Sequence, residues 1–159
     1  MDVESSDAEG VPCAHGGVAG GHSLYVKGHR LYCAYDWIGA TLQVVDADRE
    51  ISPGKHVLTA EFAANGRSTD PAMPCAVGTL TLYMDDQEVG GKDITTQPGS
   101  FCAVRDGFCV GRDGASPVTP DRQGPFSFTG GMIDRVVVDV SGERHVGHDA
   151  PARGWLMLD

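Results

Sequence analysis

The segment that decides the expected fold spans residues 126–140 and reads FSFTGGMIDRVVVDV. β-Branched residues dominate its second half, and such side chains fit a pleated sheet better than a helix. The glycine pair at 130–131 suits a bend or a bulge. In an extended chain, alternate residues from Asp134 to Val140 share one face. The segment is therefore predicted to be a long closing strand with no catalytic group built into it.

Other short segments of the chain also have the composition of strands, and each is bounded by Gly, Pro or Asp. The predicted strands are His22–Val26, Arg30–Tyr35, Thr41–Asp46, Lys55–Phe62, Gly78–Met84, Gln87–Val89, Lys92–Thr96 and Phe108–Gly111. No segment shows a sustained 3.6-residue apolar period with a cap, so little helix is expected. The pattern predicts an all-β fold, a two-sheet antiparallel sandwich of jelly-roll type.

The chain has 159 residues, which suits one domain with a sizeable core. Its first ten residues include several acids and no base, so residues 1–10 are predicted to be an acidic flexible tail. Residues 11–145 are expected to form the β-sandwich domain, and residues 146–159 a C-terminal tail. The formal net charge of -10 argues against nucleic acid and against an anionic membrane surface as partners.

The cysteines and the start of the chain indicate the cellular compartment. Five cysteines, an odd number, show no Cys-x-x-Cys spacing. No basic-then-apolar signal peptide opens the chain, and no apolar run approaches the roughly 20 residues of a membrane span. Reduced thiols and a cytoplasmic location are therefore expected. A bond between Cys102 and Cys109 stays open as an alternative.

Six segments stand out together for their order and spacing along the chain. They are His15–Val26 (HGGVAGGHSLYV), Leu31–Gly39 (LYCAYDWIG), Ser52–His56 (SPGKH), Gly78–Gly90, Val110–Asp113 (VGRD) and Pro125–Val140. In this order they resemble the C-terminal domain found in many actinobacterial-type arylsulfatases, over roughly residues 11–145. The resemblance implies a concanavalin A-like, laminin G-like sandwich that follows an alkaline-phosphatase-like catalytic domain. One departure is Asp85-Asp86, where the family favours Asp-Gly.

The resemblance implies part of a sulfatase rather than a complete one. Sulfatase chemistry needs a Cys or Ser in a C/S-x-P-x-R setting, and no Cys or Ser of this chain stands in that motif. The expected function is a non-catalytic accessory domain that packs on an arylsulfatase catalytic domain or shapes its entrance. The candidate contacts lie at predicted turns: His15, His22, Trp37, Arg112 and Asp113.

Three alternatives remain open. A free-standing carbohydrate-binding module of the lectin or laminin G kind would use exposed aromatic rings, with Trp37 the first candidate. Such a sandwich can hold calcium through carboxylates, and Asp134 or Asp139 would then serve as ligands. The third alternative, an independent enzyme, is supported only by scattered His and Asp residues. His145-x-x-His148 has metal-ligand residue types, but two solvated histidines explain it more simply.

Overall fold

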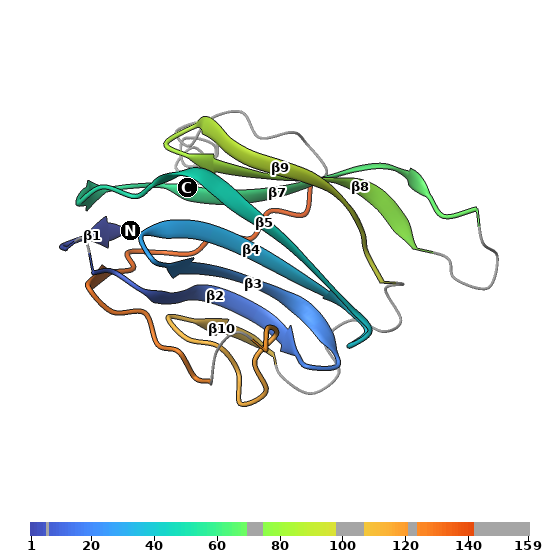
Figure 1. The fold of residues 1–159 in the computed structure, drawn as a ribbon, viewed down its shortest axis with the longest axis horizontal. Helices are drawn as coiled ribbons and strands as arrows, with labels where there is room; N and C mark the ends of the chain where they lie inside the picture. The colour runs from blue at the N-terminus through green and yellow to red at the C-terminus, as the bar shows by residue number, and fades with distance from the viewer. Residues whose placement is uncertain (6, 70–74, 98–106, 121–123, 142–159) are drawn as a thin grey trace, which may run out of the picture.

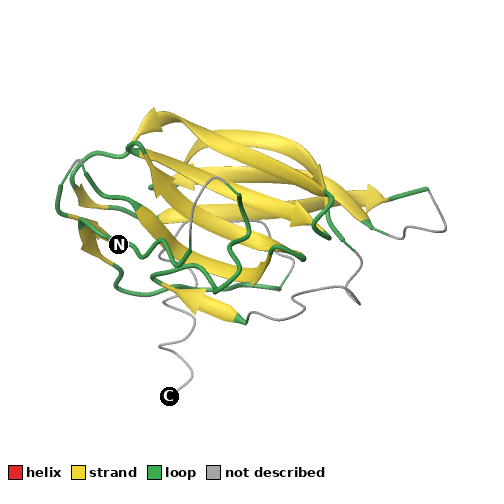
Figure 2. Cartoon of the chain, turned by 60° about the horizontal axis from the view of Figure 1, so that its bottom comes forward, coloured by secondary structure: helices red, strands yellow, loops and turns green. Residues whose placement is uncertain are grey.

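The computed structural model describes residues 1–5, 7–69, 75–97, 107–120 and 124–141. These residues form strands, turns and loops, with no helix among them (Figure 2). The strands are β1 (Asp2–Val3), β2 (Gly10–Gly17), β3 (Gly20–Lys27), β4 (Arg30–Trp37), β5 (Thr41–Glu50), β6 (Gly54–Lys55), β7 (Leu58–Arg67), β8 (Ala76–Met84), β9 (Gln87–Thr95), β10 (Phe108–Val110) and β11 (Gly131–Met132). The predicted all-β class is confirmed. A helix that could cross a membrane is absent from the described residues.

The strands form three antiparallel sheets, in the orders β10-β2-β3-β4-β5, β7-β8-β9 and β11-β1-β6. The two larger sheets lie on one another as layers, with β5 beside β9 (Figure 1). Side chains join the sheets along this line. The amide of Gln43 donates to the carbonyl of Thr95 at 2.8 Å and accepts from its N–H at 2.9 Å. The architecture is therefore consistent with a β-sandwich.

The main core lies between the two larger sheets. On the five-stranded sheet it includes Leu24 and Leu31, and on the three-stranded sheet it includes Leu80, Leu82 and Met84. The alternation of β8 predicts that these last three residues share one face, and all three are buried. Burying a leucine or methionine side chain contributes about 1.5 to 3 kcal/mol, so this stripe anchors the sandwich.

A second, smaller core covers the opposite face of the five-stranded sheet. Its buried members are Val11, Ala14, Tyr25 and Ala34, with Phe126 packed against them. The ring of Tyr25 stacks on that of Tyr32, its cross-strand neighbour, with centroids 5.0 Å apart. The chain that follows β10 passes along this face, and it is coloured yellow to orange in Figure 1. The tyrosines of β3 and β4 are therefore core or core-flanking residues, as their sequence context suggests.

The first ten residues belong to the folded domain, which differs from the flexible tail expected for residues 1–10. Strand β1 lies in the centre of the β11-β1-β6 sheet. Val3 is 3% exposed and Ala8 is 4% exposed. The terminal ammonium of Met1 donates to the carbonyl of His56 at 2.7 Å. The acidic residues of this segment stand between apolar residues that pack into the core. The charge of the segment alone does not reveal this packing.

The closing strand predicted for residues 126–140 is wrong in most of its length. Only Gly131–Met132 form a strand, and Ser127 and Thr129 make isolated bridges. Residues 133–140 pair with none of the described strands. Val137, Val138 and Val140 are 69%, 65% and 90% exposed. β-Propensity measures the fit of a side chain to a pleated surface, and here no neighbouring strand provides one.

The thiols of Cys13 and Cys33 in the five-stranded sheet are shielded. Cys33 is 4% exposed in the middle of β4. Burial, and then the nearby thiol of Cys13, raise its pKa to about 12. Burial also raises the pKa of Cys13 to about 11. Cys109 is free, and its suggested partner Cys102 lies outside the described residues.

Candidate functional site

Two turns meet at one corner of the five-stranded sheet and form an apolar tip. The tip consists of Val18 and Ala19 between β2 and β3, and of Ile38, Gly39 and Ala40 between β4 and β5. The carbonyl oxygen of Val18 lies only 2.7 Å from the position that a Cβ on Gly39 would occupy, so the two turns touch. Figure 1 shows both turns at the lower right of the molecule. The tip carries no charged side chain, although the whole chain is acidic.

Ile38 is the unusual residue of the tip. Its φ is 49°, which is left-handed backbone that a β-branched residue rarely adopts. This conformation costs roughly 1 to 2 kcal/mol. The side chain is 38% exposed, so its burial is incomplete. Val18 beside it is 63% exposed. Backbone strain of this kind clusters at functional sites, which makes the tip a candidate for recognition.

Buried polar groups form hydrogen bonds with the backbone of the strained turn. The Oε1 atom of Gln97 accepts a hydrogen bond from the backbone N–H of Ile38 at 3.1 Å. The backbone N–H of Gln97 in turn donates to the hydroxyl of Tyr35 at 2.8 Å. The carboxylate of Asp36, 6% exposed, accepts from the N–H of Gly39. Burial raises the pKa of Asp36, and this bond opposes the rise. The tip is therefore pre-organised.

Trp37, the aromatic candidate at this corner, does not present its ring fully to solvent. It is half-buried at the end of β4, opposite Thr41 on β5. Its indole Nε1 is buried and has no hydrogen-bond partner among the described residues. A flat, open face for stacking on a sugar is the feature expected of an aromatic binding residue. The carbonyl of Trp37 instead accepts a hydrogen bond from the N–H of Ala40 at 2.9 Å, which closes the turn of the apolar tip.

The structure brings His15 and His22 together as a directly opposed pair on β2 and β3. Their rings meet edge to face with centroids 5.5 Å apart, and Phe108 on β10 lies 6.3 Å from His15. Burial, and then the charge of His15, lower the pKa of His22. His22 and Phe108 still reach solvent. The pair borders the glycine turn at residues 16–21, as the sequence predicts.

Arg112 and Asp113, the second and third residues after β10, have different environments. Asp113 is fully buried, and its Oδ1 accepts from the N–H of Gly114 at 2.9 Å. Its own N–H donates to the carbonyl of Pro125 at 2.7 Å. Arg112 is exposed and reaches the carbonyl of Asp113 at 3.4 Å. Asp113 therefore lies out of reach of a docking partner, contrary to its place among the predicted contacts, whereas Arg112 is accessible.

The carboxylates considered for calcium lie apart on the exposed segment after β11. Asp134 is exposed, and Asp139 accepts a hydrogen bond from the N–H of Ser141 at 2.8 Å. That bond lowers the pKa of Asp139. Within the described part of the chain, no three His, Cys, Asp or Glu residues gather as a metal site would require. His145 and His148 lie outside the described residues.

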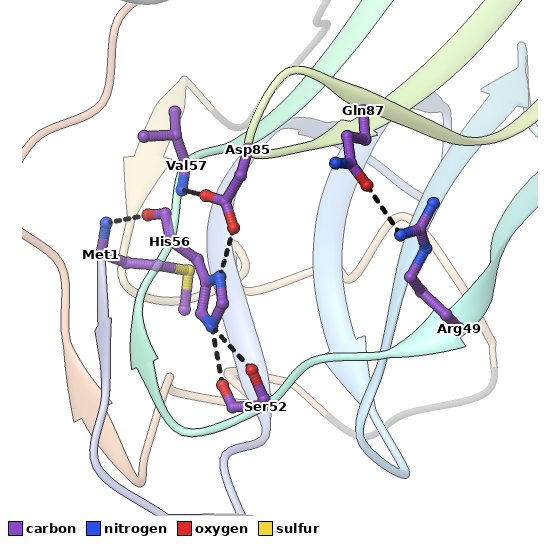
Figure 3. A network of polar contacts seen from close by, with 7 residues as sticks. All are labelled: Met1, Arg49, Ser52, His56, Val57, Asp85 and Gln87. Atoms are coloured by element: carbon purple, nitrogen blue, oxygen red, sulfur yellow. Dashed lines mark hydrogen bonds and ion pairs between the residues drawn. The ribbon is translucent and has the colours of Figure 1, made fainter.

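A polar network that sequence reasoning missed joins Ser52, His56, Val57 and Asp85, and we refer to it as the His56 clasp (Figure 3). The Nδ1 atom of His56 lies 2.7 Å from Oδ2 of Asp85. The other carboxylate oxygen accepts from the N–H of Val57 at 2.8 Å. The signal was present as the SPGKH segment and the Asp85-Asp86 turn, but only folding places them together.

The clasp has the residue types of a hydrolase triad without the geometry. The Nε2 atom of His56 lies 2.8 Å from the backbone carbonyl of Ser52, and 3.4 Å from its hydroxyl. A bond to a carbonyl requires a hydrogen on Nε2, so this nitrogen cannot take the serine proton. The side chain of His56 is 11% exposed. The clasp therefore ties the β8–β9 turn to the segment before β7.

A pocket of about 360 Å³ lies beside Ser52 and is lined by Asp7, His29, Glu50, Ile51, Ser52 and Pro53. The Nδ1 atom of His29 is buried there without a hydrogen-bond partner among the described residues. The volume falls at the lower end of the range for small-ligand sites, roughly 300 to 1,000 Å³. Its lining offers carboxylates, a hydroxyl and the imidazole of His29, but no Phe, Tyr or Trp ring.

The described residues thus contain a pre-organised apolar tip, a structural clasp and a small pocket with carboxylates in its lining. None of these arrangements places an activated nucleophile beside a base. Comparisons of the chain with protein-family models, with curated proteins and with solved structures found no match.

Proposed function

We propose that this chain is a non-catalytic accessory domain that docks through its apolar tip onto the catalytic domain of an arylsulfatase-type enzyme. Ile38 carries the proposal, because it is exposed, apolar and held in a strained conformation by buried polar groups. The order of segments that resembles the sulfatase C-terminal domain supports the choice of partner. We further propose that the sandwich is connected as a jelly roll of the laminin G-like kind.

Two physical features favour docking by the tip. An uncharged patch of small and branched apolar residues loses no ionic hydration when a partner covers it. A turn fixed in advance by Gln97 and Asp36 also loses little conformational entropy on binding, which favours affinity. The remaining surface is strongly acidic, with a formal net charge of -10 for the chain, and stays in water.

The replacement Ile38→Asn tests the proposal through two opposite effects. Asparagine tolerates left-handed backbone, so the free energy of unfolding should rise by about 1 kcal/mol in urea titrations. Docking should weaken roughly tenfold, because a central apolar contact is lost. The binding measurement is calorimetry of the chain with the catalytic domain of an arylsulfatase of the resembled family.

The matched control is Val77→Asn. Val77 is 37% exposed, against 38% for Ile38, but it lies in β8 with ordinary strand backbone. This variant should leave docking unchanged. If wild type fails to bind the catalytic domain, or if both variants weaken binding equally, the docking proposal is wrong.

A carbohydrate-binding module is the second candidate, and the pocket beside Ser52 favours it. Carboxylates of Asp7 and Glu50 could accept hydrogen bonds from sugar hydroxyls, and the volume of about 360 Å³ admits one sugar ring. The pocket offers no Phe, Tyr or Trp ring on which a sugar face could stack. Calorimetric titration with neutral and sulfated oligosaccharides distinguishes the two functions, since Glu50→Gln should abolish sugar binding and leave docking by the tip unaffected.

A further inference from the structure

The segment from Ile133 to Val140 follows β11 and pairs with none of the described strands. It continues from β11 without a turn or bend. Among the described residues, its backbone N–H and C=O groups make no hydrogen bond to another part of the chain. Val137, Val138 and Val140 are each at least 65% exposed. A β-rich segment with free backbone groups is a template on which another strand can pair.

The charges of this segment are complementary to those of a second copy of itself. When two copies run antiparallel and cross at Val137, Arg135 of each lies directly opposite Asp139 of the other. Val136 then faces Val138, and Asp134 faces Val140. Opposite charges placed across neighbouring strands stabilise pairing, whereas like charges oppose it. Other antiparallel registers can be centred within this segment. In none of them does the arginine of each copy lie opposite a carboxylate of the other with both pairs on the same face of the ribbon.

We propose that two copies of this chain associate through residues 134–140 as an antiparallel, two-fold β-interface centred on Val137. The symmetry is that of the commonest protein dimers, in which one surface contacts itself. One face of the ribbon would gather Val136, Val138 and Val140 of both copies, with an Asp134 carboxylate at each end of this apolar strip. The other face would hold the two Arg135–Asp139 pairs on either side of Val137.

The accessible groups of the segment fit this use. Arg135 and Asp139 are both exposed, and neither forms an ion pair with another described residue. The whole chain carries a formal charge of -10, so two copies repel each other at a distance. The two Arg–Asp pairs place compensating charges at the point of contact. This interface uses none of the tip residues and does not depend on the docking function.

The test is the solution mass of the full chain as a function of concentration, by analytical ultracentrifugation in 0.15 M salt. One strand pair buries less than the roughly 1,200 Å² of a stable interface, so dissociation is expected on the order of 10 to 100 µM. Wild type should reach twice the monomer mass well above that concentration. Arg135→Asp and Asp139→Arg should each remain monomeric, because each places like charges in opposition.

The double variant Arg135→Asp/Asp139→Arg restores both pairs and should dimerise as wild type does. Val137→Pro is an independent variant, because it removes a backbone N–H and blocks pairing at the centre without touching a folded contact. Circular dichroism verifies that every variant folds. A wild-type chain that stays monomeric at 500 µM, a dimer that survives the single charge changes, or a double variant that stays monomeric overturns the proposal.

Discussion

Replacing Gly16 with alanine is expected to destabilise the domain by roughly 2 to 5 kcal/mol, from its left-handed backbone and from overpacking. Gly16 has a φ of 87° at the end of β2. A Cβ placed there would lie 2.3 Å from the carbonyl oxygen of Gly20 and 2.8 Å from the Cα of Gly21. Both atoms belong to the backbone of the paired strand and cannot rotate away. Urea unfolding followed by tryptophan fluorescence measures the loss.

Gly28 provides the control for backbone conformation alone. Its φ is 54°, and nothing lies within 4 Å of the position of an added Cβ. Gly28→Ala should therefore cost only about 1 kcal/mol. If the two alanine variants lose the same stability, close packing across the β2–β3 turn makes no contribution. A larger loss at Gly16 would show that the backbone contact beneath the apolar tip sets the cost.

Replacing Asp85 and Asp86 with glycine, one at a time, is expected to change stability in opposite directions. Their φ values of 52° and 65° fit a type I′ hairpin turn, where glycine relaxes the backbone at either position. Asp86→Gly should therefore stabilise by about 0.5 to 1 kcal/mol. Asp85→Gly should destabilise by about 1 to 3 kcal/mol, since His56 and the N–H of Val57 lose their acceptor.

The comparison tests the His56 clasp, because the two residues have the same side chain and adjacent places in one turn, and Asp85 is the one that bonds to His56 and to the N–H of Val57. Melting temperature and urea midpoint of the two variants supply the measurement. Asp85→Asn adds a third point, since it keeps the shape of the side chain and its acceptor oxygen but removes the charge, and should fall between wild type and Asp85→Gly. Equal effects at the two positions would mean that the clasp does not stabilise the fold.

Local patterns in the sequence predict the strands that have alternating faces. Arg30–Tyr35, Thr41–Asp46 and Gly78–Met84 lie within β4, β5 and β8. The apolar stripe of β8 is buried as its alternation indicates. The turn at Asp85-Asp86 is also predicted, although neither residue is glycine. These elements are predicted correctly because each has its own residue alternation and is bounded by turn residues.

Other elements fail for physical reasons that single segments do not reveal. β2 is rich in glycine, and its pairing with β3 depends on backbone approach rather than on side-chain propensity. The segment 133–140 has the strongest β composition of the chain, yet it pairs with none of the described strands. The pairing of Asp2–Val3 between β6 and β11 joins parts of the chain far apart in sequence. Such contacts depend on the whole fold and cannot be read from the composition of one segment.

The candidate site was predicted only as a location. The sequence marks the corner around Trp37 but not the strained backbone of Ile38, which follows from how the β4–β5 turn is closed. Gln97 supports that turn across 59 residues, and no local motif points to it. Asp113 has the composition of a surface turn, and its complete burial depends on the later chain segment around Pro125.

The shielded thiol of Cys33 gives the domain an internal reporter of its own opening. With a pKa of about 12 and 4% exposure, this thiol presents almost no thiolate to a reagent at neutral pH while the sheet is closed. Alkylation at Cys33, read by peptide mass spectrometry, therefore records the opening of strands β3 to β5 rather than surface reactivity. Because the readout is specific to one peptide, it can follow this domain even when it is joined to, or bound by, a much larger protein.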